Sequence, residues 1–393
     1  MNKGEYGKKI SDWYFYRCVF PMIDGVVNVV DNYARKMSTT AEVYVFAPDY
    51  GKIENIDEFP YKIIRTKSIK IPKLDYRISF PVFDAFFEKN IKRIRFDIIH
   101  VHSPFAVGNY GIHYAKKNNI PLIATLHSQY KKDFIEHSKN KFISDIAISE
   151  LMRRLNKCDR LIAVNEEVAK VFHEYGANRM PVVIRNATDL LPLEDETLTN
   201  NLREKYQIQY EQKVLLYVGR LDKIKNIDFL IDSLIILKKK EFKFKMIFIG
   251  SGPYEVFMKK KISANNLHDD TIFTGRIINR LELSAYYKLS DLFLFPSLYD
   301  TSSLVQVEAA SQHTPTLFLE KAITASTIND GVNGYISNDS PFTYAETIID
   351  IFNDTNRYEQ ICDNAFKDLY LTWDLIVSEL KVHYQDLIEN NPE

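Results

Sequence analysis

Short runs of apolar residues alternate with longer segments in which apolar residues recur every three or four positions, almost throughout the chain. The short runs predict β-strands, and the periodic segments predict amphipathic helices. Regular alternation of the two is typical of βα units, in which parallel strands form a sheet that helices cover. We therefore predict an α/β protein built on parallel sheets.

The apolar runs form two series along the chain. The first series predicts strands at 14–20, 43–47, 98–102, 122–126, 161–164 and 182–184. The second predicts strands at 214–218, 245–249, 272–274, 292–295 and 316–319. Helices are predicted among them at 26–37, 226–240, 253–265 and 280–289. Two such series predict two doubly wound domains, whose ligands bind at the carboxyl ends of the strands.

A polar segment separates the two series. Residues 187–205 carry three consecutive acids, Glu194 to Glu196, and predict a linker that serves as a hinge. We therefore assign residues 1–190 to an N-terminal domain and residues 191–370 to a C-terminal domain. A last helical stretch, 371–393, follows the second series. Two facing domains would hold a ligand in the cleft between them.

The composition suits a soluble two-domain protein. A chain of 393 residues is too long for one ordinary core, and 46% of its residues are hydrophobic while 26% are charged. Cys18, Cys158 and Cys362 lie far apart without metal-ligand spacing, which favours a reducing compartment. We see no signal peptide and no run long enough to span a membrane. We therefore expect a cytoplasmic protein, which can still contact the inner face of the cell membrane.

The net charge of −1 conceals two halves of opposite sign. Residues 1–190 contain 30 basic and 22 acidic residues, whereas the remainder contains 21 and 30. Within Tyr61–Arg95, ten basic residues accompany three acidic ones, which favours contact with an anionic membrane surface or a polyanionic substrate. For any single residue of this segment, a solvated helix face with ordinary lysines is at least as good an explanation. No nucleic-acid partner is expected, because the chain is neutral overall and carries no recognised binding motif.

Two glycine turns follow strands of the second series. Gly219 is followed by Arg220 and Lys225 before the next helix, and two cations beside a helix N-terminus suit a pyrophosphate. A basic loop that caps a sheet is the structural alternative. Gly250 and Gly252 form the second turn, which lacks the third glycine of a dinucleotide-binding motif. The sequence therefore gives little support to a nicotinamide enzyme.

Two carboxylates lie in an otherwise apolar stretch after the strand at 292–295. Thr301, Ser302 and Ser303 predict a helix N-terminus, whose free amides can hold an anion. Asp300 precedes this N-terminus, and Glu308 lies about two turns further on. Because carboxylates are rarely buried without a partner, Glu308 either faces solvent or binds something. Two acids with phosphate-binding amides between them suit a nucleotide sugar.

These motifs resemble the retaining glycosyltransferases of family 4, also called group 1, which have the GT-B fold. That family carries two acids separated by seven residues after a strand that ends in Pro-Ser, as Asp300 and Glu308 follow Pro296-Ser297 here. Further motifs occur in the family's order: Val218-Gly-Arg-Leu, Gly250-Ser-Gly-Pro, Phe273-Thr-Gly, Ser290–Ser297 and Asp330-Gly-Val-Asn-Gly. The resemblance implies two Rossmann-like domains that face a cleft. It also implies that the last helix packs back on the first domain.

The first half resembles the same family at three strand ends. Phe20–Val26 resembles the loop whose backbone approaches the donor phosphate, at Gly25. His102-Ser-Pro-Phe and Thr125-Leu-His resemble two strand-end motifs, and in the family the second histidine, here His127, contacts the donor sugar. Together with Asp300-Thr-Ser-Ser-Leu, the first motif is nearest to bacterial diacylglycerol glucosyltransferases. Capsule and exopolysaccharide enzymes share parts of this pattern.

The resemblance implies a metal-independent hexosyltransferase of cell-envelope glycoconjugate synthesis. The donor would be a nucleotide diphosphate sugar, with a UDP-sugar expected, and the acceptor a lipid, a lipid-linked glycan or a protein-linked glycan. The implied catalytic residues are His127, Arg220, Lys225, Asp300 and Glu308. The implied donor-binding residues are Gly25, Gly219, Gly250, Gly252, Gly275, Arg276, Thr301, Ser302, Ser303, Leu304 and Val305. No cofactor is expected, and the chain contains no Asp-x-Asp pair for a metal.

Two other functions remain open. Asp300 replaces the family's usual glutamate, and Glu320–Ser326 replaces its usual glycine pair and Pro-Glu. These departures are what a catalytically silent subunit that binds and stabilises a partner glycosyltransferase would show. A UDP-sugar epimerase shares the two-domain architecture and would release a free nucleotide sugar without using an acceptor.

Overall fold

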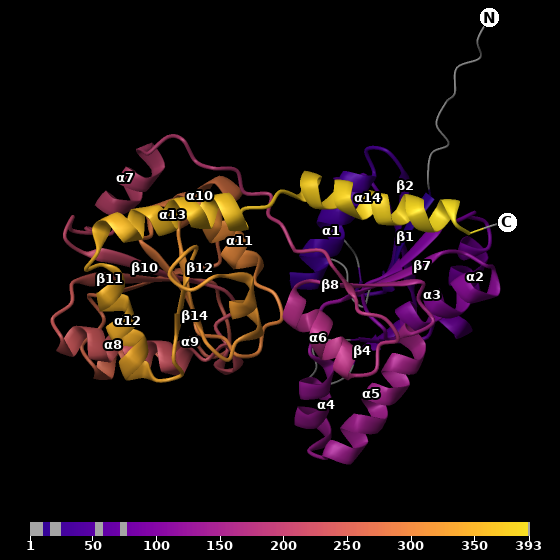
Figure 1. Cartoon of the computed structure of the whole chain (residues 1–393), viewed down its shortest axis with the longest axis horizontal. Helices are drawn as coiled ribbons and strands as arrows, with labels where there is room; N and C mark the ends of the chain where they lie inside the picture. The colour runs from indigo at the N-terminus through magenta and orange to yellow at the C-terminus, as the bar shows by residue number, and fades with distance from the viewer. Residues whose placement is uncertain (1–10, 16–24, 52–57, 71–76, 392–393) are drawn as a thin grey trace, which may run out of the picture. The chain divides into compact units, whose positions relative to one another are not determined.

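The computed structural model describes residues 11–15, 25–51, 58–70 and 77–391 (Figure 1). The chain divides into two compact units, here called the first unit, Met1–Arg185 with Trp373–Glu393, and the second unit, Asn186–Thr372. Each unit is a parallel sheet covered by helices, so the predicted α/β class is confirmed. Cys18, residues 16–20 of the strand predicted at 14–20, residues 20–24 of the predicted donor loop and residues 71–76 of the basic segment lie outside the described residues.

The first unit contains a seven-stranded parallel sheet of order β3-β2-β1-β6-β7-β8-β9. Its strands are β1 Ser11–Phe15, β2 Glu42–Pro48, β3 Lys62–Thr66, β6 Ile98–Val101, β7 Leu122–Leu126, β8 Arg160–Ala163 and β9 Val182–Val183. Its helices include α1 Gly25–Met37, α2 Ala85–Ile91, α3 Ala106–Lys117, α4 Tyr130–Ser138, α5 Lys141–Leu155 and α6 Glu166–Glu174. The strand order reverses between β1 and β6, so the carboxyl end of β6 lies at a topological switch point, where such sheets bind ligands.

An antiparallel hairpin interrupts this unit between β3 and α2. It pairs β4, Ser68–Lys70, with β5, Arg77–Ser79, and leads through the short 3₁₀-helix η2, Pro81–Phe83, into α2. The apolar pattern predicted neither the hairpin nor β3. Strand β3 lies at the sheet edge and buries only Thr66 fully, so basic and polar residues break up its apolar run.

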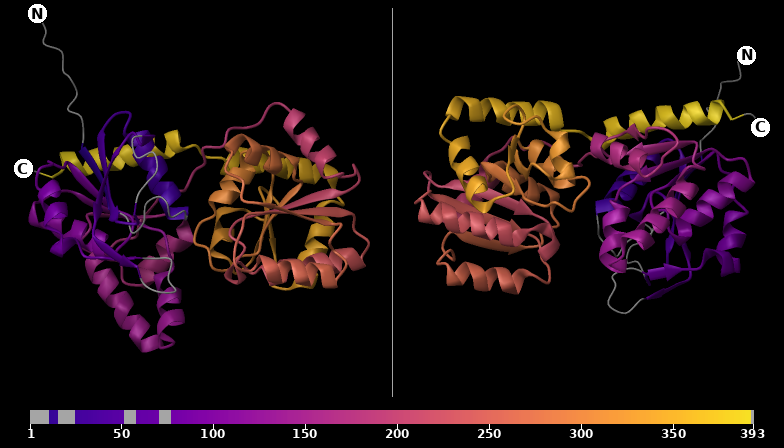
Figure 2. Two further views of the ribbon diagram at one scale, coloured as in Figure 1. Left: turned by 180° about the vertical axis from the view of Figure 1, so that it is seen from behind. Right: turned by 60° about the horizontal axis from the view of Figure 1, so that its bottom comes forward.

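The last helix, α14 Trp373–Glu389, packs in the first unit against α1 (Figure 2). Trp373 meets the ring of Tyr33 edge-on, with ring centroids 5.5 Å apart. The hydroxyl of Tyr384 lies 2.6 Å from Nδ1 of the buried His100. The carboxyl-terminal residues therefore complete the core of the unit in which the chain began.

The second unit contains a six-stranded parallel sheet of order β12-β11-β10-β13-β14-β15. Its strands are β10 Lys213–Val218, β11 Phe244–Ile249, β12 Thr271–Gly275, β13 Leu292–Phe295, β14 Thr316–Leu319 and β15 Tyr335–Ser337. Its helices are α7 Thr197–Lys205, α8 Ile227–Lys239, α9 Glu255–Ala264, α10 Arg280–Leu289, α11 Leu304–Ala310, α12 Pro341–Ile351 and α13 Thr355–Leu369.

Strand β10 shows why this sheet is apolar on both faces. Leu215 and Tyr217 pack into one core cluster, and Val214 and Leu216 pack into another, so consecutive side chains enter opposite layers. The strand order reverses between β10 and β13, which brings the loop after Gly219 next to the loop that carries Asp300.

The prediction of a linker and hinge over 187–205 is wrong for its second half. Residues Thr197–Lys205 form α7, which packs against α10 and buries Leu202. Leu198 and Leu202 are four residues apart and face the same core, a helical pattern that the preceding acids obscured. Thr188 donates its backbone N–H to Leu371 O at 2.9 Å, so the two chain crossings between the units are tied to each other.

Candidate active site

The glycine turns of the second unit form a hydrogen-bonded row at the carboxyl ends of three adjacent strands. Gly219 N donates to Ile249 O at 3.0 Å, and Gly250 N donates to Gly275 O at 2.9 Å. A Cβ on Gly250, whose φ is +135°, would lie 1.9 Å from Gly219 O. A Cβ on Gly252 would lie 2.2 Å from Leu221 O. Close backbone packing therefore requires glycine at positions 250 and 252, whatever these turns bind.

Lys225 and Asp300 are brought together at the switch point of the second sheet. Lys225 Nζ lies 2.5 Å from Asp300 Oδ1, and the two side chains are 21% and 19% exposed. Asn226 adopts a left-handed conformation with a φ of +60°, and its Nδ2 donates to Pro296 O at 3.2 Å. This bond joins the loop of Lys225 to the end of β13. Asp300 Oδ2 is buried without a hydrogen-bond partner among the described residues, so it can accept from a ligand.

Arg220 and Arg276 lie at strand ends as the sequence placed them. Arg220 has an exposed side chain, and its Nε lies 3.4 Å from Asp222 Oδ2. Arg276 follows Gly275, whose φ of +72° suits glycine, and is exposed. Both side chains are therefore accessible to an anion at the carboxyl edge of the sheet.

Glu308 is buried in α11 and has two partners that the sequence did not reveal. Its Oε1 accepts from Arg280 Nη2 at 2.8 Å, and its Oε2 accepts from the hydroxyl of Tyr287 at 2.8 Å. Arg280 also donates to Asp189, with Nε 3.1 Å from Oδ2. Burial raises the pKa of Tyr287 well above its ordinary value, and the negative charge of Glu308 adds to this, so the tyrosine stays a donor.

These partners explain how an apolar helix tolerates a carboxylate. Arg280 and Tyr287 are seven residues apart on α10, so both project from one helix face toward α11. That spacing is visible in the sequence, but nothing in the sequence indicates which helix this face meets.

The N-terminus of α11 lies between the two acids. The helix begins at Leu304, and Ser303 is its N-cap, with Oγ accepting from Gln306 N at 3.1 Å. Ser302 Oγ accepts from Asn186 Nδ2 at 2.7 Å. Thr301 is buried, while Leu304 and Val305 are half-buried in the first turn.

The segment 320–326, which departs from the family's usual glycine pair and Pro-Glu, packs beside this helix. It overlaps the 3₁₀-helix η4, Ile323–Thr327. The hydroxyl of Thr327 donates to Gln306 Oε1 at 2.8 Å, which connects η4 to α11. Ala322 and Ala325 of the altered segment also share a core cluster with Ala309 and Ala310 of the helix that carries Glu308.

The remaining two predicted site residues lie in the first unit. Gly25 is exposed at the start of α1. His127 follows β7 and is buried, with Nε2 3.0 Å from His102 Nδ1. The ring of His100 stacks on that of His102 at 4.1 Å between centroids. Burial lowers the pKa of His127 to about 3, so this imidazole stays neutral near pH 7 and offers hydrogen bonds rather than charge.

The described residues contain no group of three or more histidine, cysteine or acidic side chains that could hold a metal ion. The helices among them include none that is long and apolar enough to cross a membrane.

Two family profiles match most of the chain. "Glycosyltransferase Family 4" matches residues 23–190, and "Glycosyl transferases group 1" matches residues 199–368. The chain belongs to the family 4, group 1 glycosyltransferases. The boundary between the two matched regions lies a few residues after the end of the first unit at Arg185.

Several proteins with assigned names are similar to this glycosyltransferase. An alpha-monoglucosyldiacylglycerol synthase of Streptococcus pneumoniae is 28% identical over 306 residues, which cover 76% of this chain and 68% of that protein. A GDP-mannose-dependent alpha-mannosyltransferase of Corynebacterium glutamicum is 24% identical over 381 residues, which cover 94% and 87%.

A solved structure confirms the GT-B fold of the glycosyltransferase. The crystal structure of Anabaena HepE in complex with UDP and glucose superposes with a TM-score of 0.76 at 17% identity, covering 95% of this chain and 99% of that one. At this level of identity the likeness concerns the fold alone.

Proposed function

We propose that this glycosyltransferase is a retaining hexosyltransferase that takes its sugar from a UDP-sugar and passes it to a membrane glycerolipid or another lipid-linked acceptor of the cell envelope. The observation that carries the donor half is the Lys225–Asp300 pair at the switch point of the second sheet. It offers a cation for a diphosphate and a buried carboxylate oxygen, Asp300 Oδ2, for a sugar hydroxyl. A neutral ligand or an isolated phosphate would use only one of these groups.

The leaving diphosphate would be held by charge. Lys225 and Arg220 would neutralise it as negative charge develops, a role that fixed cations perform without a metal ion. The acceptor oxygen would attack the anomeric carbon while the bond from that carbon to the diphosphate breaks. The leaving phosphate oxygen would accept the acceptor's proton, as the family resemblance implies for retention of configuration.

Glu308 would hold the ribose of the donor. Its two carboxylate oxygens already accept from Arg280 and Tyr287, but each retains a lone pair for a ribose hydroxyl. The same partners fix its rotamer before the nucleotide arrives, so little side-chain entropy is lost on binding. Arg280 and Tyr287 would thus act as positioning residues.

The name of the Streptococcus pneumoniae relative and the surface of the first unit support the lipid acceptor. The segment after the hairpin exposes three apolar side chains, Val82, Phe83 and Phe86, which are 71%, 86% and 71% exposed. Exposing such a group of apolar side chains to water is unfavourable, so it is typical of a surface that contacts a membrane or a partner. Exposed cations Lys89, Lys92 and Arg93 follow on and after α2. We propose that this part of the 61–95 segment rests on an anionic bilayer.

One acidic side chain of the 61–95 segment is buried, so the exposed surface of the segment is more basic than its composition. Asp84 is buried as the N-cap of α2, and its carboxylate accepts from the backbone N–H groups of Phe87 at 3.1 Å and Lys67 at 2.8 Å. These hydrogen bonds lower the pKa of Asp84 although burial alone would raise it, so the carboxylate stays ionised near neutral pH.

The donor proposal is tested by calorimetric titration with UDP and GDP in the absence of metal. We expect UDP to bind, and we expect Glu308→Ala to weaken binding at least tenfold, the loss of about 1.4 kcal/mol from one charged hydrogen bond. Glu282→Ala, an exposed acid on α10, is the matched control. Denaturant unfolding of each variant reports whether it is folded.

The alternatives give different results in the same experiment. Preferential binding of GDP would retain the reaction class and change the donor base. A folded protein that binds neither nucleotide would be a silent subunit, to be sought with a partner glycosyltransferase. Release of an epimerised nucleotide sugar without an acceptor would identify an epimerase.

A further inference from the structure

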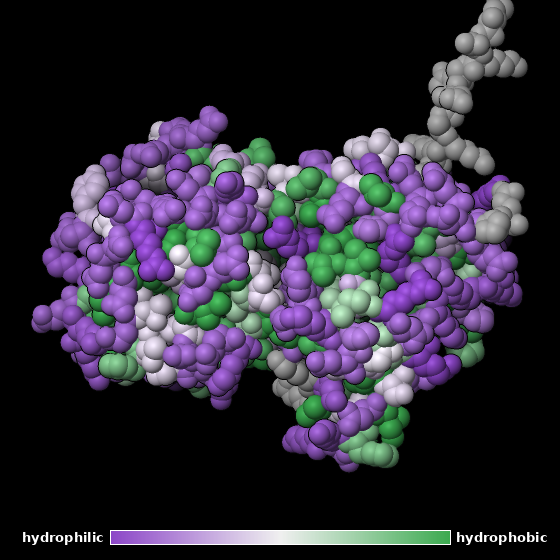
Figure 3. Space-filling view, in the orientation of Figure 1, coloured by the Kyte–Doolittle hydropathy of each residue, from purple (hydrophilic) through white to green (hydrophobic). Residues whose placement is uncertain are grey.

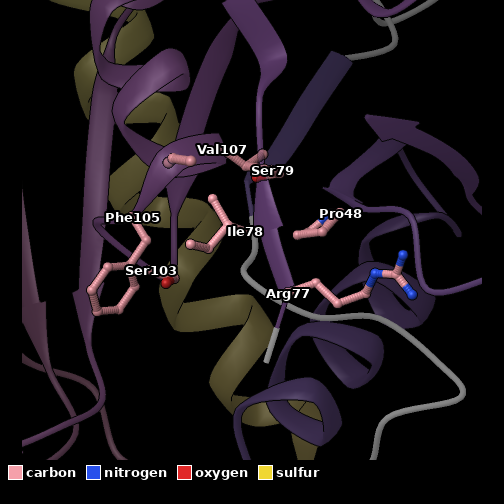
Figure 4. Close-up of a pocket in the computed structure, with 9 residues that line it drawn as sticks. Pro48, Arg77, Ile78, Ser79, Ser103, Phe105 and Val107 are labelled. Atoms are coloured by element: carbon pink, nitrogen blue, oxygen red, sulfur yellow. The ribbon is translucent and has the colours of Figure 1, made fainter. Parts of the chain in front are cut away.

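The first unit contains a cavity of about 200 Å³ at the carboxyl edge of its sheet (Figure 4). Its wall combines the end of β2, strand β5, the loop after β6 and the first turn of α3. The lining residues are Pro48, Arg77, Ile78, Ser79, Ser103, Phe105, Ala106, Val107 and Gly108. Because β6 borders the switch point of this sheet, the cavity lies where a ligand is expected on topological grounds.

One buried hydroxyl in this cavity lacks a partner. Ser103 is 5% exposed, and its Oγ has no hydrogen-bond partner among the described residues. Figure 4 shows the serine beside Ile78 and Phe105. Since buried polar groups are nearly always hydrogen-bonded, this oxygen is suited to bond with something that enters the cavity.

The neighbouring backbone holds Ser103 in place. A Cβ on Gly108 would lie only 1.8 Å from Ser103 O, so α3 approaches the loop after β6 as closely as glycine allows. On the opposite side, Arg77 Nε donates to Ser68 Oγ at 2.8 Å and its Nη2 donates to Ser68 O at 3.0 Å. The cavity is therefore bounded by fixed elements of the fold.

Apart from Arg77 and Ser79, the rest of the lining is apolar, and this apolar part continues to the surface. Ile78 lines the cavity and is nevertheless 48% exposed. It is followed along the chain by exposed Phe80 and Val82, and then by the other apolar residues proposed to rest on a bilayer. A ligand that reaches Ser103 past Ile78 would meet hydrocarbon first and a hydroxyl last.

We infer that this cavity takes the free hydroxyl end of a glycerolipid acceptor. Ser103 Oγ would donate to or accept from the glycerol hydroxyl, while Ile78, Val107 and Phe105 contact the hydrocarbon beside it. Ser103 is thus an acceptor-positioning residue, not a group that takes part in bond making. The inference rests on the proposed function and specifies the acceptor class of that reaction.

The test is Ser103→Ala in the full-length protein, with dioctanoylglycerol as acceptor and a UDP-hexose as donor. Loss of one neutral hydrogen bond should raise the KM for the glyceride about five- to tenfold. UDP affinity by calorimetry should not change. Ile78→Asn, which places an amide on the apolar wall, should raise the same KM. Ser149→Ala, at an exposed serine of α5, is the control and should leave both quantities unchanged.

Each other outcome overturns a defined part of the inference. An unchanged glyceride KM in Ser103→Ala would mean that the cavity holds only water. An equal loss of UDP affinity would mean that the substitution disturbs the fold, which thermal unfolding and the Ile78→Asn variant would resolve. If wild-type protein binds UDP but transfers sugar to no glyceride, the acceptor class is wrong while the donor proposal stands. If it binds no nucleotide, the proposed function itself fails.

Discussion

The carboxyl edges of the two sheets share a topology but differ in chemistry. In the second unit, the switch point carries the Lys225–Asp300 ion pair, and glycine turns bring backbone close together. In the first unit, the corresponding edge carries neutral histidines and a cavity with an apolar wall. We propose that one of these edges takes a charged diphosphate and the other an uncharged amphiphile. The proposed role of each unit therefore depends on the loop residues after the strands and not on the strands themselves.

The largest effect is expected at the charged edge. Lys225→Met removes the cation that we propose faces the leaving diphosphate and leaves Asp300 without its ion-pair partner, so the sugar-transfer rate should fall about 10²- to 10³-fold. Lys223→Met, at an exposed lysine of the same loop, is the matched control and should change the rate less than threefold, in line with small surface effects. Steady-state transfer assays measure both variants. Equal losses in the two variants would refute a specific role for Lys225.

A pH dependence of intermediate size is expected at the neutral edge. Burial lowers the folded-state pKa of His127 from 6.5 to about 3. Between these two pH values, the unfolded chain therefore binds a proton at this histidine that the folded protein does not bind. The free energy of unfolding should therefore fall as the pH drops below 6.5, by about 1.4 kcal/mol per pH unit for each such histidine, until the pH reaches the folded-state pKa. Burial also lowers the pKa values of His100 and His102, so the three contributions add.

Urea unfolding of wild type and His127→Gln between pH 7 and pH 4.5 measures this slope. In the variant, the slope of the unfolding free energy against pH should be smaller by the contribution of one histidine, about 1.4 kcal/mol per pH unit. A wild-type stability that is flat over this range would show that these imidazoles are hydrated and can be charged in the folded protein.

The smallest effect is expected at the surface next to the cavity. Binding to vesicles that contain anionic lipid should weaken several-fold as salt rises, because screening shortens the reach of the cations of 61–95. Phe83→Ser should weaken binding at every salt concentration, since it removes an 86% exposed apolar side chain. Co-sedimentation with vesicles measures both effects, and salt-independent binding would contradict the electrostatic part.

A second apolar surface provides a comparison for that experiment. Hydrophobic side chains gather at the tip of the α4–α5 hairpin (Figure 3), where Phe142, Ile143 and Ile146 are exposed. Phe142→Ser is therefore the matched control for Phe83→Ser. A larger loss of vesicle binding in Phe142→Ser would move the membrane contact from the 61–95 segment to the hairpin tip.

The sequence predicted most of the sheet framework because its central strands are buried on both faces. The predicted bounds of β7, β13, β14 and α10 agree with the structure to the residue. Edge strands such as β3 and β15 are only partly apolar and escaped the pattern. Helix α7 was not predicted, because its polar residues and the acids before it have the composition of a linker.

The candidate site was predictable only where one segment carries it. Asp300 and Glu308 share a segment and were found together, but Lys225 is 75 positions before Asp300 and their contact follows from strand order alone. The partners of Glu308, Arg280 and Tyr287, lie on another helix, and no local pattern specifies which helices meet. Ser103 was visible only as part of a strand-end motif, because a missing hydrogen-bond partner is a property of three-dimensional packing.

The position of α14 has a consequence for the order of events during synthesis. The second unit is one continuous stretch, Asn186–Thr372, and can fold as soon as it leaves the ribosome. The first unit has already emerged by then, but Tyr384 reaches His100 only after the last part of the chain has been made. A ribosome that stops within residues 373–384 would therefore release a protein whose later-made unit is finished and whose earlier-made unit is not.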